Sequence, residues 1–358
     1  MNPQEQMLEY PWDMTQPEPG YAINVADGVR WVRMPLPFAL DHINLWLLRD
    51  QIDGRDGWTV VDCGIDRPEV RECWEAVFNQ VLEGLPVLRV IVTHMHPDHI
   101  GLAHWLCQRW QAPLWMSMTD YALARLWTGT TATDTSVEGS GPAGESAARH
   151  FGRHGLVDPE AQALIRKRHD YYARLVPDVP KQYHRLLNGQ TLSIGGRDWQ
   201  PIAGYGHAPE HMSLWCPTLD VLISGDMVLP RISTNISVFD LEPEANPLPL
   251  YLESLKDYDS LPERTLVLPS HGRPFRGLHE RIAQQQAHHA ERLAEVLAAC
   301  HHPQSAYDLL PVLFHRQLDM HQLGFAMGEA VAHLHALYFQ GDLIRSLGED
   351  GVYRFCQA

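Results

Sequence analysis

The 358-residue sequence contains no run of 18 or more uncharged apolar residues, so no segment is predicted to cross a membrane as a helix. Its first residues also lack the basic stretch and following apolar run that mark a secretory signal. The six cysteines are scattered and form no Cys-x-x-Cys pair, a pattern typical of unpaired thiols in a reducing compartment. We therefore expect a cytoplasmic protein that does not bind membranes.

Basic residues are scarce: 28 Lys and Arg stand against 44 Asp and Glu, a formal net charge of -16. Because nucleic-acid phosphates are bound by clustered cations, this balance argues against general nucleic-acid binding and favours a small-molecule substrate. With 45% apolar and 20% charged residues, the chain is globular. Its length suits one large domain with an appendage, or two domains.

A dense group of polar side chains follows an apolar run. Val87 to Val92 reads as a strand buried on both faces, and His94, His96, Asp98 and His99 come directly after it. Open α/β sheets usually place their ligands at the carboxyl ends of strands. Burying four such groups without an ion would cost roughly 1 to 3 kcal/mol for each unpaired group. The cluster therefore predicts a metal site.

Three more residues of ligand type lie just past apolar strands farther along the chain. His207 is on a glycine-rich turn between two predicted strands, Asp226 ends the run that begins at Val221, and His271 follows Leu266 to Pro269. Because strand ends at one edge of a sheet converge, these side chains are expected to meet the first cluster.

The segments around these residues indicate a mixed-sheet α/β domain. Strands are expected over 28–35, 44–48 and 59–64, followed by a helix over 67–82 and the strand over 87–92. Residues 1–20 are polar and rich in proline, and are expected to pack loosely over the domain.

Residues 116–187 have the character of a helical insertion. A helix is predicted around 121–127, a Thr/Ser/Gly loop over 129–144, and one long helix over 159–176. Such inserts can act as a lid or a substrate wall. A solvated helical hairpin fits the sequence equally well.

The motifs together carry a family resemblance. In order and spacing, over residues 21 to 280, the chain resembles the five motifs of the metallo-β-lactamase superfamily: Val61-Asp62-Cys63-Gly64, Thr93-His94-Met95-His96-Pro97-Asp98-His99, Gly206-His207, Gly225-Asp226 and Ser270-His271-Gly272. The resemblance implies an α/β fold, the αββα sandwich, over residues 1–280. The complete set resembles the hydrolase branches more than the true lactamases.

The resemblance also implies two metal ions. By position, one ion would be held by His94, His96 and His207, the other by Asp98, His99 and His271, with Asp226 as the bridge. Imidazole and carboxylate ligands without thiolate favour Zn²⁺, with Fe or Mn as alternatives. Two such ions would generate a metal-bound hydroxide as the nucleophile.

Several residues are candidates for supporting roles. Asp98 could steer the hydroxide or pass a proton to the leaving group, or it could be only a ligand. Asp62 could orient the ligand histidines or merely cap the following helix, and His211 is a candidate to support the ligands or the fold. Arg231 and Tyr205 are candidates for substrate contacts, although an Arg beside carboxylates can equally be a salt-bridge partner.

Residues 281–358 form a predicted second domain. A helix over 278–300, another over 325–337 and a hairpin over 341–355 resemble a small winged helix, as found in lactamase-like hydrolases that include an endoribonuclease branch. Five Lys or Arg against eight acids argue against a role on nucleic acid. We expect a packing or homodimerisation element that could wall the active site. The pairs His288-His289 and His301-His302 are expected to be exposed.

The preferred functional hypothesis is a dinuclear metal-dependent hydrolase of a small-molecule ester, thioester or lactone. Trp115, Tyr121 and Trp127 are expected to line its apolar pocket. The alternative hypothesis is a metallo-endoribonuclease acting on single-stranded RNA, which the C-terminal resemblance favours and the charge opposes. A binding module with a weak site fits poorly because every ligand position is present.

Overall fold

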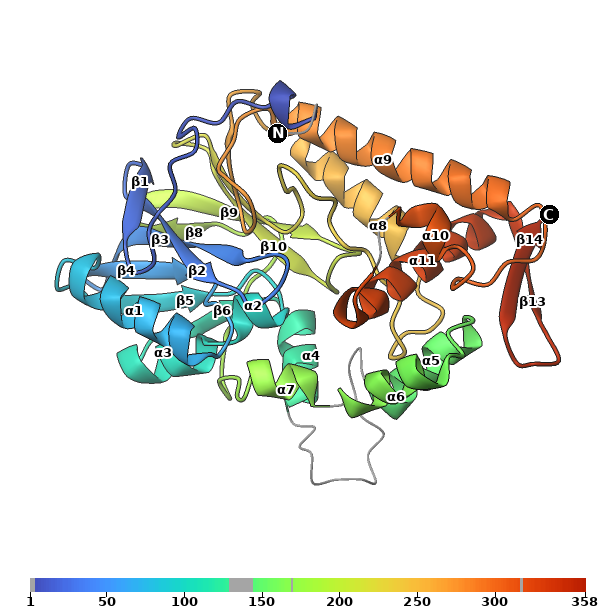
Figure 1. The fold of residues 1–358 in the computed structure, drawn as a ribbon. Coiled ribbons are helices and arrows are strands. Elements are labelled where there is room, and N and C mark those ends of the chain that lie inside the picture. Colours follow the sequence, from blue (N-terminus) through green and yellow to red (C-terminus); the bar gives the residue numbers. More distant parts are fainter. Residues whose placement is uncertain (1–3, 129–143, 169, 316–317) are drawn as a thin grey trace.

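A computed structural model describes residues 4–128, 144–168, 170–315 and 318–358, and two sheets lie at its centre (Figure 1). The first sheet contains, in spatial order, β1 (Ala22–Ala26), β2 (Val29–Pro35), β3 (His42–Ile52), β4 (Arg55–Val61), β5 (Val87–Ile91), β6 (Leu114–Met116) and β7 (His184–Arg185). It is antiparallel from β1 to β4 and parallel from β4 to β7. The second sheet contains β12 (Leu266–Pro269), β11 (Val221–Gly225), β10 (His211–Cys216), β9 (Arg197–Gly204) and β8 (Leu192–Ile194).

The alternation of side chains along β3 shows how the layers form. Ile43, Leu45 and Leu47 point to one face, where they pack against α1 (Pro68–Gln80) and α3 (Ala103–Trp110). Trp46 and Leu48 point to the opposite face and pack against the second sheet. Because successive strand residues face opposite sides, one apolar run supplies both layers of core.

The second sheet has helices on its far face. Leu222 and Val267 pack there against α8 (Pro247–Ser254), α9 (Leu278–Ala299) and α11 (Met320–Gln340), whereas Ile223 faces the first sheet. Figure 1 shows α1 and α3 beside the first sheet and α8 and α9 beyond the second. The αββα sandwich expected from the sequence is confirmed.

The helical insertion differs from its prediction at one point. In place of one helix over 159–176, the structure has α6 (Pro159–Lys167) and α7 (Tyr171–Leu175). The break lets Tyr172 become buried, with its hydroxyl donating to the carbonyl of Met95 at 2.6 Å. This contact forms far along the chain, so local periodicity could not reveal it. The insertion also contains α4 (Met118–Thr128) and α5 (Glu145–Arg153), whereas the short helix α2 (Pro97–Ile100) lies before it, directly after β5. The predicted loop over 129–144 lies almost entirely outside the described residues.

The N-terminal arm is more firmly attached than expected. Its short helix η1 (Glu5–Met7) precedes Leu8, which is buried in the core with α9. Glu9 then pairs with Arg276 in an isolated β-bridge. The prediction of loose packing is wrong because Leu8, within this polar stretch, supplies an apolar anchor.

The C-terminal segment consists of α9, the short α10 (Leu310–Leu313), α11 and the antiparallel hairpin of β13 (Leu343–Leu347) and β14 (Tyr353–Gln357). Its winged-helix resemblance, the domain boundary at 281 and a homodimer stay predictions. His289 is buried against His333 and Tyr251, so its expected exposure is wrong; α9 buries the face that carries it. Among the described helices, none is long and apolar enough to span a membrane.

Asn44 on β3 joins the two sheets. Its side-chain oxygen accepts from Trp31 Nε1 at 2.8 Å, and its amide donates to the carbonyls of Pro269 and Gly272 at 2.8 and 3.0 Å. The side chain is fully buried. It therefore ties the first sheet to the turn that carries His271.

We predict that Asn44→Ala lowers the free energy of unfolding by about 2 to 4 kcal/mol, because buried polar partners lose their hydrogen bonds. Urea unfolding in the presence of EDTA measures this change without a contribution from metal. Asn24→Ala, at an exposed position on β1, is the control and should change stability little. Equal stability of the two variants would contradict the role of Asn44.

Candidate metal centre

Seven residues of ligand type meet at the carboxyl-end edge of the two sheets. His94, His96, Asp98 and His99 follow β5, Asp226 follows β11, and His271 follows β12. His207 lies in the turn between β9 and β10. The structure places their ligand atoms in two groups, within each of which the atoms lie no more than 4.8 Å apart: His94, His96, His207 and Asp226, and Asp98, His99 and His271.

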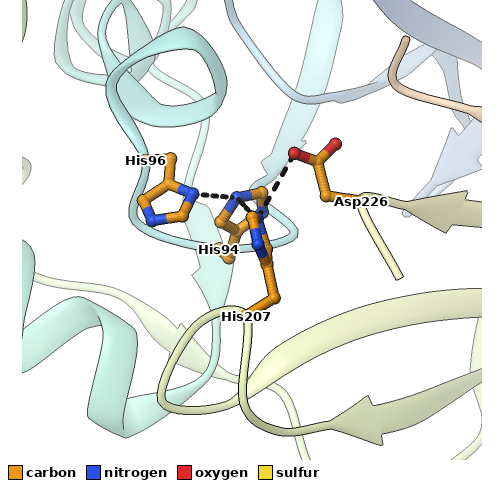
Figure 2. A group of neighbouring side chains, drawn as sticks. All are labelled: His94, His96, His207 and Asp226. Atoms are coloured by element: carbon orange, nitrogen blue, oxygen red, sulfur yellow. Dashed lines mark hydrogen bonds and ion pairs between the residues drawn. The ribbon is translucent and has the colours of Figure 1, made fainter. Parts of the chain in front are cut away.

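In the first group, three imidazole nitrogens converge (Figure 2). His94 Nε2 lies 2.8 Å from His96 Nδ1 and 3.3 Å from His207 Nε2, and His207 Nε2 lies 3.3 Å from Asp226 Oδ2. Burial and the neighbouring imidazoles hold the pKa of His94 well below its usual range, and burial lowers that of His96 to about 3. Neutral rings that face each other with lone pairs repel, and a shared cation removes this repulsion.

The second group shares Asp226 with the first. Asp98 Oδ2 lies 3.3 Å from His271 Nε2 and 3.6 Å from His99 Nε2, and Asp226 Oδ1 lies 3.5 and 3.6 Å from the same two nitrogens. Burial lowers the pKa of His271, but the Asp226 and Asp98 carboxylates outweigh it and raise that pKa to about 10. The two carboxylates therefore favour a positive charge at His271.

Two buried atoms show that the residues fit metal ions. His99 Nε2 and Asp226 Oδ1 make no hydrogen bond to any described part of the chain. Buried polar atoms are normally satisfied, and both atoms point to where the donors converge. Imidazole nitrogen and carboxylate oxygen are also the donors that Zn²⁺, Fe and Mn accept.

Asp62 orients His99, one of the histidines of ligand type. Its carboxylate accepts from His99 Nδ1 at 2.8 Å and from the backbone N–H of Thr93 at 2.8 Å. The residue has a positive φ of 62°, a strained conformation for a non-glycine residue. Asp62 does not cap α1, whose N-cap is Arg67. The geometry therefore favours the orienting role over the capping role.

Hydrogen bonds also fix three other histidines at or beside the centre. His207 Nδ1 donates to the carbonyl of Asn235 and His271 Nδ1 to that of His42, each at 2.8 Å. His211 Nε2 accepts the backbone N–H of Asp226 at 3.1 Å. A Cβ on Gly225 would lie 2.1 Å from His211 Nε2, so only glycine permits this approach. The bonds of His207 and His271 fix the ring nitrogens that face the centre, and the bond to His211 holds the backbone of Asp226.

Asp120 was not anticipated from the sequence. Its buried carboxylate accepts from the backbone N–H groups of Met95 at 2.9 Å and Glu210 at 2.7 Å. It thereby ties the loop that carries His94 and His96 to the turn that carries His207. The sequence signal, an Asp three residues after Ser117, is the same as that of an ordinary helix start.

The ligand residues open into a cavity of about 920 Å³. His96, Asp98, His207, Asp226 and His271 line its base. Its walls come from three separate parts of the chain: Leu36–Leu40 near the N-terminus, the insertion with Trp127, Arg168, Tyr171, Tyr172 and Leu175, and the C-terminal segment with Leu313, Phe314, Leu318, Phe325 and Glu329. The rim after Asp226 contributes Leu229, Ile232, Ser233, Thr234 and Asn235.

Some expected pocket residues lie elsewhere. Trp127 lines the cavity, but Trp115 stacks on His184 and Tyr121 on Tyr183, so their expected place in the pocket is wrong. Arg231 is also absent from the lining: its side chain is 71% exposed, and its Nε lies 3.9 Å from Glu5 Oε2.

Tyr205 is likewise exposed and does not line the cavity. At both positions the backbone passes close to the site while the side chain points outward. That direction depends on the path of each turn, which sequence spacing does not reveal. Neither candidate substrate contact is therefore brought to the ligand cluster.

Comparison with known proteins identifies the family. The description "Metallo-beta-lactamase superfamily" matches residues 39–271, and "Metallo-beta-lactamase-like, C-terminal domain" matches residues 293–358. The chain belongs to the metallo-beta-lactamase superfamily. Together with the clustered histidines and aspartates, this membership makes it a metallo-hydrolase.

Individual relatives extend the comparison. A beta-lactamase domain protein from Burkholderia ambifaria has 54% identity, a TM-score of 0.93 and full coverage of both chains. A probable metallo-hydrolase, YqjP of Bacillus subtilis, is 22% identical over 86% of this chain and 91% of its own. An atrochrysone carboxyl ACP thioesterase of Aspergillus fumigatus is 27% identical over 34% of this chain and 35% of its own.

We predict that Asp62→Asn weakens metal binding by about 10- to 100-fold, because His99 loses the carboxylate that orients its ring. Competition with a chromogenic chelator measures the affinity, and elemental analysis measures the metal content. Asp56→Asn, at an exposed position on β4, the strand that Asp62 follows, should bind metal as the unaltered protein does. Unchanged affinity in Asp62→Asn would show that Asp62 serves only the fold.

Proposed function

We propose that the protein uses two divalent metal ions, Zn²⁺ in the first place, to hydrolyse an ester, thioester or lactone of a small apolar molecule. The observation that carries the proposal is that the ligand cluster forms the base of a large cavity with mostly apolar walls. Phe38, Trp127, Phe314 and Phe325 contribute rings to these walls. Enclosed apolar pockets with few polar groups are typical of small-molecule sites.

Different residues of the chain would bind the metal ions and position the substrate. His94, His96 and His207 would hold one ion and Asp98, His99 and His271 the other, with one oxygen of Asp226 directed to each group. When bound, such ions lower the pKa of a coordinated water toward neutrality and polarise the attacked carbonyl. The apolar walls would position the acyl or alcohol part of the substrate and exclude bulk water.

Asp98 is the proposed proton acceptor at the base of the cavity. Burial raises its pKa, but His99 and His271 outweigh this and lower it to about 2, so the carboxylate is ionised at neutral pH. Its Oδ2 contacts both histidines, which leaves Oδ1 to accept a proton from the attacking water. The proton would then pass to the leaving group.

Two considerations support a carbonyl substrate over RNA. The described lining includes two arginines, Arg168 and Arg292, and the Arg292 guanidinium already bonds Glu295 at 2.6 Å. RNA binding uses grooves with many cations along the backbone. The thioesterase among the relatives, although it matches only about a third of each chain, acts in the proposed class of chemistry.

A screen of purified protein with quantified metal tests the function. Aryl esters, acyl thioesters, lactones, phosphodiesters and single-stranded RNA are compared at equal concentrations, with EDTA-treated protein as the control. We expect two metal equivalents per chain and turnover of an ester, thioester or lactone. Cleavage of RNA alone would replace the proposed function, and a protein that binds no added Zn²⁺ would refute it.

We predict that Asp98→Asn lowers kcat by about 100-fold or more, because the amide cannot accept the proton. Some metal should be retained, since five histidines and Asp226 remain in place. Steady-state kinetics and metal analysis of the same preparation separate the two effects. Full activity would exclude proton transfer by Asp98.

A further inference from the structure

One wall of the active-site cavity comes from helix α11 in the C-terminal segment. Phe325 and Ala326 lie one helical turn before Glu329, and all three residues line the cavity. Two of them are apolar, as expected of a wall for an apolar substrate. Glu329 places a carboxyl group in the same wall.

The position of α11 is set by its contact with the rim of the cavity. The backbone N–H of Val238 donates to the carbonyl of Gly328 at 3.1 Å. A Cβ on Gly328 would lie 2.7 Å from the Ser237 Cβ, so glycine is needed for this close approach. Glu329, the next residue on the helix, is thereby held against the same rim.

Glu329 is joined to the metal centre through one residue. Asn235 donates from Nδ2 to Glu329 Oε2 at 3.3 Å, and its backbone carbonyl accepts from His207 Nδ1 at 2.8 Å. The Ser237 hydroxyl donates to Asn235 Oδ1 at 2.7 Å, which fixes the amide with its NH₂ toward Glu329. The carboxyl is therefore placed at a defined distance from the ligand cluster, with Asn235 between them.

The surroundings of the Glu329 carboxyl allow it to be either protonated or ionised. Burial raises the pKa of Glu329 to about 7, against smaller lowering effects of Asn235 and Arg292. The basic groups near it in the lining are Arg292 and His288, and Arg292 bonds Glu295. Apart from the bond from Asn235, the carboxyl has no hydrogen bond to any described residue, although buried carboxyls usually have several.

We propose that Glu329 is a specificity-determining residue that hydrogen-bonds a hydroxyl group on the substrate, beyond the apolar part that the surrounding rings contact. A hydroxyl is the matching group because it accepts from the protonated carboxyl and donates to the ionised one. The proposal rests on the proposed function, since it describes the substrate of the same cavity. It identifies the substrate as a hydroxylated ester or thioester.

Pairs of aryl esters and acyl thioesters that differ by one distal hydroxyl on the acyl chain test this assignment. The hydroxylated member of the best pair should have a KM about 3- to 10-fold lower in the unaltered protein, the size expected of one hydrogen bond. Glu329→Leu should abolish that difference, so that the two members of the pair have the same KM. Glu329→Gln, which retains hydrogen-bonding atoms, should restore part of it.

A binding measurement separates this inference from the proposed hydrolase function. Non-hydrolysable amides with and without the hydroxyl are titrated calorimetrically into the metal-loaded protein. If no ester or thioester is turned over, the hydrolase function fails, and the amide pair still decides the role of Glu329. Equal preference for the hydroxyl in the unaltered protein and in Glu329→Leu overturns the inference.

Matched controls exclude a purely structural effect. Glu291→Leu removes an exposed acid from α9 in the same C-terminal segment and should keep the full preference. Thermal unfolding and metal content are measured for every variant. A Glu329→Leu protein that loses both substrates of each pair equally, together with stability, would show that Glu329 only supports Asn235 and would overturn the assignment.

Discussion

Five imidazoles and two carboxylates gather at one sheet edge, and this arrangement is favourable only with positive charge between them. The rest of the structure depends on this constraint. Ring nitrogens within 2.8 and 3.3 Å of each other, and buried atoms such as His99 Nε2 without a hydrogen bond to the described chain, are unfavourable without a cation. Leaving such groups unsatisfied costs roughly 1 to 3 kcal/mol each. Two metal ions would satisfy all of them, so a cluster that is unfavourable by itself becomes a binding site.

Holding these groups together requires supports outside the cluster. Asp62 orients His99, Asp120 ties the loops after β5 and β9, and Asn44 joins the first sheet to the turn after β12. Every one of these supports is a buried polar side chain that bonds backbone groups. Metal sites need ligands placed to within a fraction of an ångström, and buried hydrogen bonds between rigid strands supply that precision.

In the cavity, the residues that would catalyse the reaction and those that would select the substrate come from different parts of the chain. The residues of ligand type come from the sandwich, whereas the walls come from the loop Leu36–Leu40, the insertion and the C-terminal segment. A fold shared by many enzymes does not determine the substrate, so the walls must do so. Gly328 and Asn235 connect the two parts, because α11 approaches the rim closely and the rim bonds His207.

The sequence by itself determined that seven residues of ligand type would meet at one sheet edge, and its motifs predicted the sandwich through their family resemblance. Its signals there are local: His94 to His99, Asp226 and His271 each follow an apolar strand, and the ends of such strands converge in any open sheet. The break between α6 and α7 depended on tertiary packing, as did the packing of Trp115 and Tyr121 outside the cavity and the outward direction of Arg231. So did the roles of Asp120 and Glu329, which contact residues distant in the chain. Hydrophobic periodicity indicates which face of a helix or strand is apolar. It does not indicate which distant segment packs against that face.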